Sequence, residues 1–194
     1  MQSDPGEGGS CSLFALVTYV PDPLGSFLDA LRQELVPTCN LRAHVTVLPP
    51  RRLAIPVEAA WNRIRSDAVA YPAFEIAIND VEIFSISSVV YLGLAAGRQE
   101  LVRLHDLLNT NVLHTVEAYP YHPHITLAQN MAPEQVAGVF ELARRRWAEY
   151  RGARRFPADR VTFVRGETLD CWRDLRECEL APAQTRLMGP LHGG

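Results

Sequence analysis

The feature that most constrains the fold of this chain is a four-residue pattern that occurs twice. His44-Val45-Thr46-Val47 and His124-Ile125-Thr126-Leu127 both read histidine, apolar residue, threonine, apolar residue. In an extended strand successive side chains point to opposite faces, so the histidine and the threonine share one face while the apolar residues enter the core. Each copy therefore predicts a half-buried strand that presents an imidazole beside a hydroxyl.

The elements around the two copies follow a similar order. The first series predicts a strand at 12–20, a helix at 24–35 with leucines at helical spacing, the motif strand at 40–48 and a helix from Pro56 to about residue 70. We expect Pro49-Pro50 to end that motif strand, because proline supplies no donor to a sheet. Strands follow at 74–78 and 81–86 around an Asn79-Asp80 turn, and at 89–94. The second series predicts a helix at 99–113, the motif strand at 122–128, a helix at 133–150 and strands near 160–164 and 175–180.

This order predicts the fold class. The two histidines are 80 positions apart (124 − 44), so the simplest architecture is two similar lobes that face each other across a cleft. We expect a bilobed α+β fold with two pseudo-symmetric, mainly antiparallel sheets flanked by helices, each lobe placing one motif strand in the central cleft. Residues 12–182 would form this single domain. Residues 1–11 would be a flexible leader, and 183–194 an arm or a disordered tail.

Composition excludes several mechanisms. The net charge of −3 gives no global attraction to nucleic acid, and all 19 basic residues are arginine. Without lysine the chain can form neither a lysyl-adenylate, as ATP-dependent ligases do, nor the P-loop that binds nucleotide phosphates. The four cysteines show no CxxC spacing, and neither a signal peptide nor a membrane-spanning run is visible. We therefore expect a soluble, reduced, cytoplasmic protein without a membrane partner.

A single His-x-Thr strand is usually explained by a hydrogen-bonded structural histidine, but its duplication favours a composite site. Histidine titrates near neutral pH, so two facing imidazoles suit a reaction that removes a proton on one side of a centre and delivers one on the other. Phosphodiester cleavage has this demand. One of His44 and His124 would be the catalytic base and the other the acid, in an order that the sequence does not decide, while Thr46 and Thr126 would hydrogen-bond the non-bridging phosphate oxygens. This chemistry requires no metal, cofactor or covalent intermediate.

The paired motifs, the HPHITL sequence at residues 122–127 and the spacing resemble the two-histidine (2H) phosphoesterase superfamily, especially its bacterial 2′-5′ RNA ligase and cyclic phosphodiesterase branch. The resemblance spans about residues 12–180. It implies a bilobed monomer that opens 2′,3′-cyclic phosphates of RNA ends and reversibly joins 2′-5′ linkages without ATP. The 84–94 stretch is similar to the family's connector between the two halves. Partners would be RNA ends or small cyclic nucleotides.

Other functions stay open. The chain could be a phosphodiesterase for another small cyclic nucleotide, or a module that binds RNA ends with little turnover. A zinc site formed by His44, His122 and His124 is a further alternative, because imidazoles two residues apart on a strand can share a metal ion. It has weaker support, since position 42, which corresponds to His122, is arginine and no carboxylate or cysteine lies at ligand spacing.

Several residues outside the motifs are candidate contacts for RNA. Arg42 and Arg51 bracket the first motif strand, and Tyr121 precedes the second. The densest positive cluster includes Arg145, Arg151 and Arg154, which are interleaved with aromatic residues between 144 and 160. Such a surface could bind phosphates and stack bases, but arginines near the end of a helix are equally well explained as a solvated helix terminus.

Overall fold

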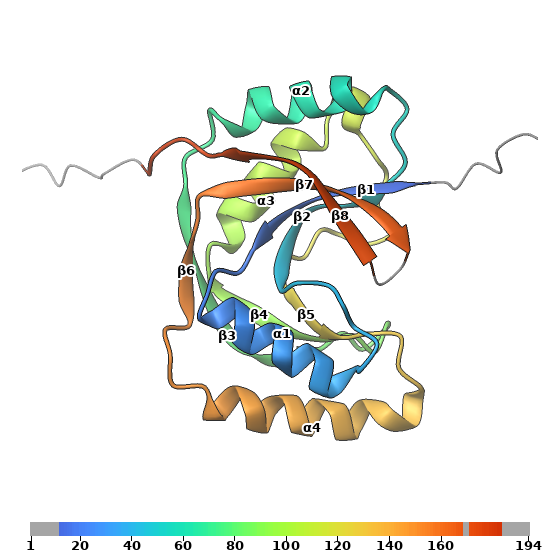
Figure 1. Ribbon diagram of the computed structural model, residues 1–194, viewed down its shortest axis with the longest axis vertical. Coiled ribbons are helices and arrows are strands. Elements are labelled where there is room, and N and C mark those ends of the chain that lie inside the picture. Colours follow the sequence, from blue (N-terminus) through green and yellow to red (C-terminus); the bar gives the residue numbers. More distant parts are fainter. Residues whose placement is uncertain (1–11, 169–170, 184–194) are drawn as a thin grey trace, which may run out of the picture.

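The computed structural model describes residues 12–168 and 171–183. Two four-stranded antiparallel sheets face each other (Figure 1). The first sheet has the order β2 (His44–Arg51), β1 (Leu13–Tyr19), β7 (Arg160–Thr168) and β8 (Cys171–Glu179). The second has the order β5 (Ile125–Ala128), β4 (Val90–Ala96), β3 (Phe74–Ile83) and β6 (Arg155–Ala158). The predicted bilobed α+β fold is confirmed. The proposed leader 1–11 and residues 184–194 of the proposed tail lie outside the described residues.

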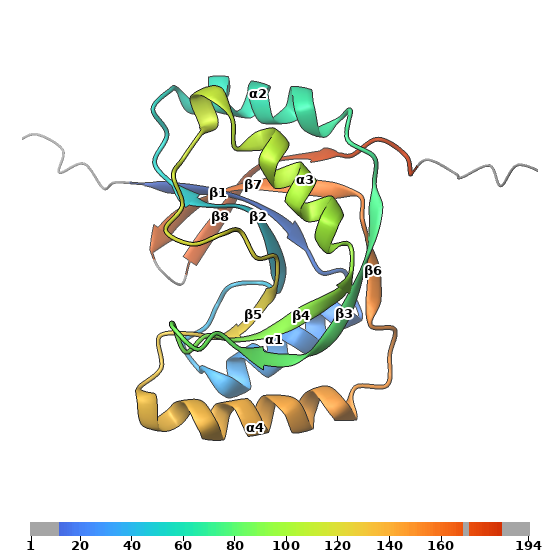
Figure 2. The ribbon, with the colours of Figure 1, turned by 180° about the vertical axis from the view of Figure 1, so that it is seen from behind.

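The helices are exchanged between the two series of elements. The helical elements are α1 (Leu24–Leu35), α2 (Val57–Ala68), α3 (Arg98–Leu108), the short 3-10 helix η1 (Asn111–Leu113) and α4 (Pro133–Glu149). Although α1 follows a strand of the first sheet, it packs against β5 and α4; α3 follows a strand of the second sheet but packs against β2 and α2 (Figures 1 and 2). Each lobe is therefore built from both halves of the sequence.

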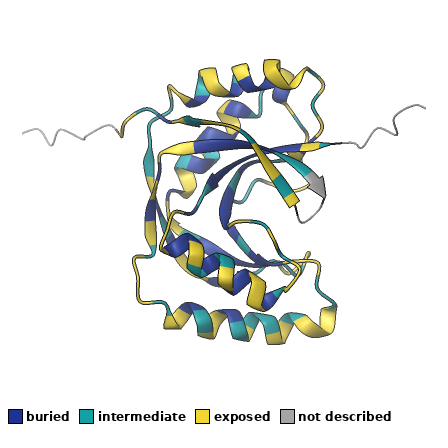
Figure 3. Cartoon of the chain, in the orientation of Figure 1, coloured by how far each residue is buried: buried dark blue, intermediate teal, exposed yellow. Residues whose placement is uncertain are grey.

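Burial explains the exchange. The leucine stripe of α1 (Leu24, Leu28, Leu31 and Leu35) is buried, and it belongs to a hydrophobic cluster that also contains residues of both sheets. Removing such side chains from water contributes roughly 1.5–3 kcal/mol each, so the helix takes the position that covers its whole stripe. By contrast, α4 buries only Ala143 and Trp147 and leaves most of its surface exposed (Figure 3).

The prediction that Pro49-Pro50 ends the first motif strand is wrong. β2 begins at His44 and runs through both prolines to Arg51. Among the described strands it lies at the edge of its sheet with β1 as its only neighbour, and the pairing becomes irregular between Leu48 and Arg51. A proline at a sheet edge or bulge removes no necessary ladder hydrogen bond, so the strand tolerates both residues.

The predicted turn at Asn79-Asp80 is also wrong. β3 is one strand that pairs with β4 on both sides of this site, and the register changes from Ile78↔Leu94 to Val81↔Leu92. Between these two pairs β3 advances by three residues and β4 by only two. The extra residue in β3 makes this site a β-bulge. The indole Nε1 of Trp147 donates to the carbonyl of Asn79 at 2.9 Å, which satisfies a backbone group that the bulge removes from the ladder.

Other elements also differ from the predictions, for example β7 (Arg160–Thr168) and β8 (Cys171–Glu179), which are longer than expected. The helix expected at 99–113 ends at Leu108 and is followed by η1, because Asn109 (ψ 49°) and Thr110 (ψ 160°) leave the helical region. The strand expected from residue 122 begins at Ile125, so His124 lies directly before it. β6 was not predicted; it is short and pairs with the beginning of β3. No helix among the described residues is long and apolar enough to span a membrane.

Candidate active site

The first motif places His44 at the start of β2, opposite Tyr19 of β1. The imidazole Nδ1 of His44 lies 2.6 Å from the backbone carbonyl oxygen of Arg42. A carbonyl oxygen can only accept a hydrogen bond, so Nδ1 must carry the proton. In the neutral ring the lone pair is therefore on Nε2, the nitrogen that is free to take up a proton.

The second motif repeats this geometry. Nδ1 of His124 lies 2.7 Å from the backbone carbonyl oxygen of His122, again two residues earlier in the chain. The same tautomer is selected, with the Nε2 lone pair of the neutral ring available. The duplication in sequence is thus a duplication of hydrogen bonding, although one histidine begins its strand and the other precedes it.

Both motifs line one cavity of about 700 Å³. Its wall includes the side chains of His44, Thr46, His124 and Thr126. Since β2 belongs to the first sheet and β5 to the second, the cavity lies between the lobes. A cavity of this size suits a small molecule or a short segment of a polymer.

The two imidazoles are held in the neutral form. Burial, then the positive charge of Arg32 and an unfavourable interaction with His124, lower the pKa of His44 from 6.5 to about 4, against the opposing hydrogen bond to Arg42. Burial also lowers the pKa of His124 below its ordinary value. Only 8% of His44 is exposed, whereas His124 is half-buried. His44 is therefore the weaker proton acceptor in the free protein, and both rings can act as bases at neutral pH.

Each histidine is also packed against two aromatic rings. His44 lies 6.3 Å from the ring centroid of Tyr19 and 5.1 Å from that of Trp172. His124 lies 5.0 Å from Phe84 and 5.2 Å from Tyr91, and both contacts are edge-on. These rings exclude water and restrict the orientation of the imidazoles. Sequence reasoning assigned none of the four a role in the site, although Phe84 and Tyr91 lie in the stretch that resembles the family's connector.

Arg32 is a further site residue that sequence reasoning missed. It is buried on α1 and lines the cavity. Its guanidinium donates to the same Arg42 carbonyl that accepts the His44 hydrogen bond, at 3.1 Å, and to Sγ of Cys39 at 3.4 Å. Within the described part of the chain its Nε has no hydrogen-bond partner. A buried cation without a carboxylate disfavours any further positive charge nearby, which explains its effect on His44.

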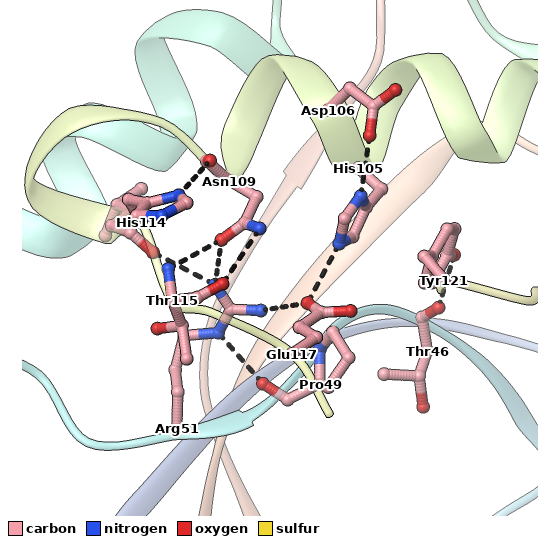
Figure 4. A network of polar contacts seen from close by, with 11 residues as sticks. Thr46, Pro49, Arg51, His105, Asp106, Asn109, His114, Thr115, Glu117 and Tyr121 are labelled. Atoms are coloured by element: carbon pink, nitrogen blue, oxygen red, sulfur yellow. Dashed lines mark hydrogen bonds and ion pairs between the residues drawn. The ribbon is translucent and has the colours of Figure 1, made fainter. Parts of the chain in front are cut away.

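A polar network beside the cavity joins the two motifs (Figure 4). Tyr121 donates its hydroxyl to the backbone carbonyl of Thr46 at 2.6 Å, and its ring stacks on His105 with centroids 4.1 Å apart. His105 Nε2 lies 2.9 Å from a carboxylate oxygen of Glu117, which also accepts from Arg51 at 3.0 Å. The network connects α3, the segment before β5 and the first motif strand.

This network changes the interpretation of two candidate contacts. Arg51 is buried, and its guanidinium donates to Pro49, Asn109, Leu113 and Glu117, so it is a structural residue. Tyr121 lines the cavity, but its hydroxyl is committed to the first motif strand. We therefore regard Tyr121 as a positioning residue.

The structure brings Arg42 close to the site but keeps the arginine cluster away from it. Arg42 lies over the ring of Tyr19 at 3.8 Å and pairs with Asp174 at 3.4 Å. Arg145 and Arg151, on and after α4, are exposed and do not line the cavity. Arg154 lies over the ring of Trp147 and donates to the backbone carbonyls of Trp147 and Tyr150. Contact between this arginine cluster and RNA stays a prediction, and it would concern RNA strands long enough to extend beyond the cavity.

The suggested zinc ligands do not form a metal-binding group. Nδ1 of His122 accepts a hydrogen bond from Arg98 at 3.0 Å, which turns this nitrogen toward a cation. Burial and Arg98 lower the pKa of His122 below its ordinary value. Among the described residues, no group of three or more histidine, cysteine, aspartate or glutamate side chains could hold a metal ion.

We predict that Tyr121→Phe lowers the free energy of unfolding by roughly 1–3 kcal/mol, because it leaves the Thr46 carbonyl without its partner while keeping the ring stacked on His105. Urea unfolding would measure this change. Tyr119→Phe, at a position that is 64% exposed, is the matched control and should leave the stability unchanged. Equal stability of Tyr121→Phe and the unmodified protein would show that packing alone joins the two segments.

Comparison with known proteins agrees with this geometry. A family model described as the 2′-5′ RNA ligase superfamily matches residues 20–170. Escherichia coli LigT in its apo form is 16% identical over 88% of this chain and 98% of LigT, with a TM-score of 0.61. LigT complexed with 3′-AMP is 17% identical over 89% and 99% of the two chains, with a TM-score of 0.60. Usb1 from Kluyveromyces marxianus is 13% identical over 84% and 96%, with a TM-score of 0.53.

These structural likenesses support the fold, and no curated protein matches the chain by sequence. The family model spans most of the chain and includes both motifs, whose histidines share one tautomer and one cavity. The protein therefore belongs to the 2′-5′ RNA ligase superfamily of two-histidine phosphoesterases.

Proposed function

We propose that the protein is a metal-independent phosphoesterase that opens 2′,3′-cyclic phosphates in RNA ends or nucleotides, and that it can reversibly form 2′-5′ linkages without ATP. The observation that carries this proposal is the pair of Nε2 atoms, each made available by an equivalent Nδ1 hydrogen bond and each accompanied by a threonine in one cavity. The similar LigT binds 3′-AMP, so a protein with the same fold accepts a nucleoside monophosphate.

His44 is the proposed base. It is the more deeply buried imidazole, and the nearby charge of Arg32 keeps its ring neutral. It would remove the proton of a water molecule that attacks phosphorus. The hydroxyls of Thr46 and Thr126 would donate hydrogen bonds to the non-bridging oxygens, where negative charge accumulates.

His124 is the proposed acid. Its imidazole is less buried, and the negative charge of a bound phosphate would raise its pKa and favour the protonated form. The protonated Nε2 would then deliver its proton to the ribose oxygen as the bond between that oxygen and phosphorus breaks. One water is consumed and one phosphomonoester forms. After the reaction His44 is protonated and His124 is neutral. Proton exchange with solvent returns both histidines to their starting forms.

The direct test is turnover by the purified protein with 2′,3′-cyclic nucleotides, 3′,5′-cyclic nucleotides and a 2′-5′ dinucleotide, with and without a chelator. We expect 2′,3′-cyclic phosphates to be opened at the same rate after chelation, with His124→Ala as the control for contaminating enzymes. Turnover only of 3′,5′-cyclic substrates would favour the alternative phosphodiesterase. Binding without turnover would indicate an RNA-end-binding module. Activity that is lost on chelation and restored by adding zinc would indicate a metal enzyme.

We predict that Thr46→Val and Thr126→Val each lower kcat, on the order of tenfold to a thousandfold, because each substitution removes a donor to the developing charge. Thermal unfolding should hardly change, since both side chains are partly exposed to the cavity. Thr110→Val is the control, because its hydroxyl donates to Leu107 outside the cavity. Near-normal kcat in both motif variants would mean that the two hydroxyls have only structural roles.

The pH dependence of kcat/KM should be bell-shaped, with apparent values that belong to the coupled pair of histidines. A base with a lowered pKa remains neutral in mild acid, so the acidic limb should lie near pH 4. The pKa of His124 is also lowered, which places the maximum on the acidic side of neutrality. For kcat, the alkaline limb should lie at higher pH, because bound phosphate stabilises protonated His124.

Arg32 allows the two histidines to be told apart. Arg32→Met removes the buried charge that opposes protonation of His44, so the acidic limb of kcat/KM should move to higher pH. Arg32→Lys keeps the charge and should leave the limb nearer its original position. If Arg32→Met moves only the alkaline limb, that limb reports His44, and the assignment of the acidic limb to His44 is wrong. If either His44→Ala or His124→Ala retains full activity at all pH values, the two-imidazole mechanism is wrong.

A further inference from the structure

Three histidines among the described residues line the cavity between the lobes, and they are held in two different tautomers. In His44 and His124 the Nδ1 proton faces a backbone carbonyl, which leaves the Nε2 lone pair available. His122 has the opposite arrangement. Its Nδ1 lies 3.0 Å from a guanidinium nitrogen of Arg98, and a guanidinium can only donate hydrogen bonds. Nδ1 of His122 must therefore accept, and the proton of the neutral ring is on Nε2.

Both members of this pair are held in place by the fold. Arg98 is the first residue of α3 and follows Gly97, which adopts φ +83°. A β-carbon at Gly97 would come within 2.7 Å of a backbone oxygen on β3, so this turn requires glycine. The ring of His122 packs edge-on against Phe84 at 5.1 Å and Tyr91 at 5.7 Å between ring centroids. Its proton and its orientation are thus both restricted.

This arrangement makes His122 a donor rather than a base. Burial and the charge of Arg98 lower its pKa below the ordinary value, so the ring is neutral at neutral pH. A hydrogen bond from a cation to Nδ1 also polarises the ring and strengthens the N–H on the other side. His122 therefore offers the cavity a polarised N–H group, whereas the two motif histidines offer lone pairs. Such a donor suits an oxygen that carries partial negative charge, as the ester oxygens of a phosphate do.

The position of His122 indicates which oxygen it would meet. Its ring centroid lies 6.2 Å from that of His124, which in the proposed hydrolysis protonates the leaving ribose oxygen. In a 2′,3′-cyclic phosphate the other ester oxygen is on the neighbouring carbon of the same ribose. We propose that His122 is a specificity-determining residue whose Nε2–H donates to the ester oxygen that stays on phosphorus, so that it decides which ribose oxygen leaves. This inference rests on the proposed function and specifies its regiochemistry.

The step balances with water alone. The water oxygen forms a bond to phosphorus and its proton passes to His44, while the bond from phosphorus to the leaving ribose oxygen breaks and His124 protonates that oxygen. The second ester bond remains intact, and His122 keeps its proton throughout. Because His122 and His124 offer different groups, the two ribose oxygens are not equivalent in the site. One phosphomonoester isomer should therefore form in excess.

The product ratio tests this assignment. His122→Phe keeps an aromatic ring beside Phe84 and Tyr91 but removes the donor. His114→Phe is the matched control, because His114 is exposed and does not line the cavity. The quantity to measure, by phosphorus NMR, is the ratio of 2′- to 3′-monophosphate formed from a 2′,3′-cyclic mononucleotide.

We expect the unmodified protein and His114→Phe to form one isomer in excess, and His122→Phe to reduce that excess about tenfold, the scale of one lost hydrogen bond. An unchanged ratio in His122→Phe would overturn the assignment, as would an unmodified protein that forms both isomers equally. If the unmodified protein opens no cyclic phosphate, the proposed function itself fails.

The tautomer is tested separately. Nitrogen NMR of the imidazoles should place the lone pair of His122 on Nδ1 and those of His44 and His124 on Nε2. Arg98→Met removes the donor to Nδ1 and should also reduce the isomer excess, whereas Arg103→Met, at an exposed position of the same helix that pairs with Glu100, should not. A lone pair on Nε2 of His122 in the unmodified protein would overturn the proposal.

Discussion

The hydrogen bond from Nδ1 of each motif histidine to the carbonyl oxygen two residues earlier is the interaction on which the site depends. It fixes the tautomer of His44 and His124 and leaves both Nε2 lone pairs available. Without these bonds each ring could turn or exchange tautomers, and the two Nε2 atoms would not both stay available. Because the acceptor is backbone, the orientation of each ring is tied to the course of its own strand.

Two buried arginines near the first motif have different roles because their partners differ. Arg51 is neutralised by Glu117 and donates to three further acceptors, so it stabilises the joint between α3, β2 and the segment before β5. Arg32 has only a backbone carbonyl and a thiol as partners among the described residues. Its charge therefore remains effective at His44, which it biases toward the neutral form. A buried charge is costly unless it is paired, and such a cost is most readily explained at a functional site.

The exchange of helices between the lobes ties each lobe to both halves of the sequence. α1 leaves the first sheet and packs with α4 on the second, and α3 makes the reverse crossing. Both sheets and the leucine stripe of α1 belong to one hydrophobic cluster. Tyr121 adds a direct hydrogen bond between the second motif segment and the first motif strand. The surface arginines of α4 contribute nothing to the cavity lining.

The sequence by itself determined the two motif strands, their alternation of polar and apolar faces and the bilobed α+β fold, because these follow from local periodicity and from duplication. It also identified His44, Thr46, His124 and Thr126, which the structure brings to one cavity; their catalytic roles stay predictions. Only the tertiary structure decided that β2 tolerates two prolines as an edge strand, that Asn79-Asp80 is a bulge, and that α1 brings Arg32 to His44. Proton affinity depends on burial and on charges that are distant in sequence, which local periodicity does not encode.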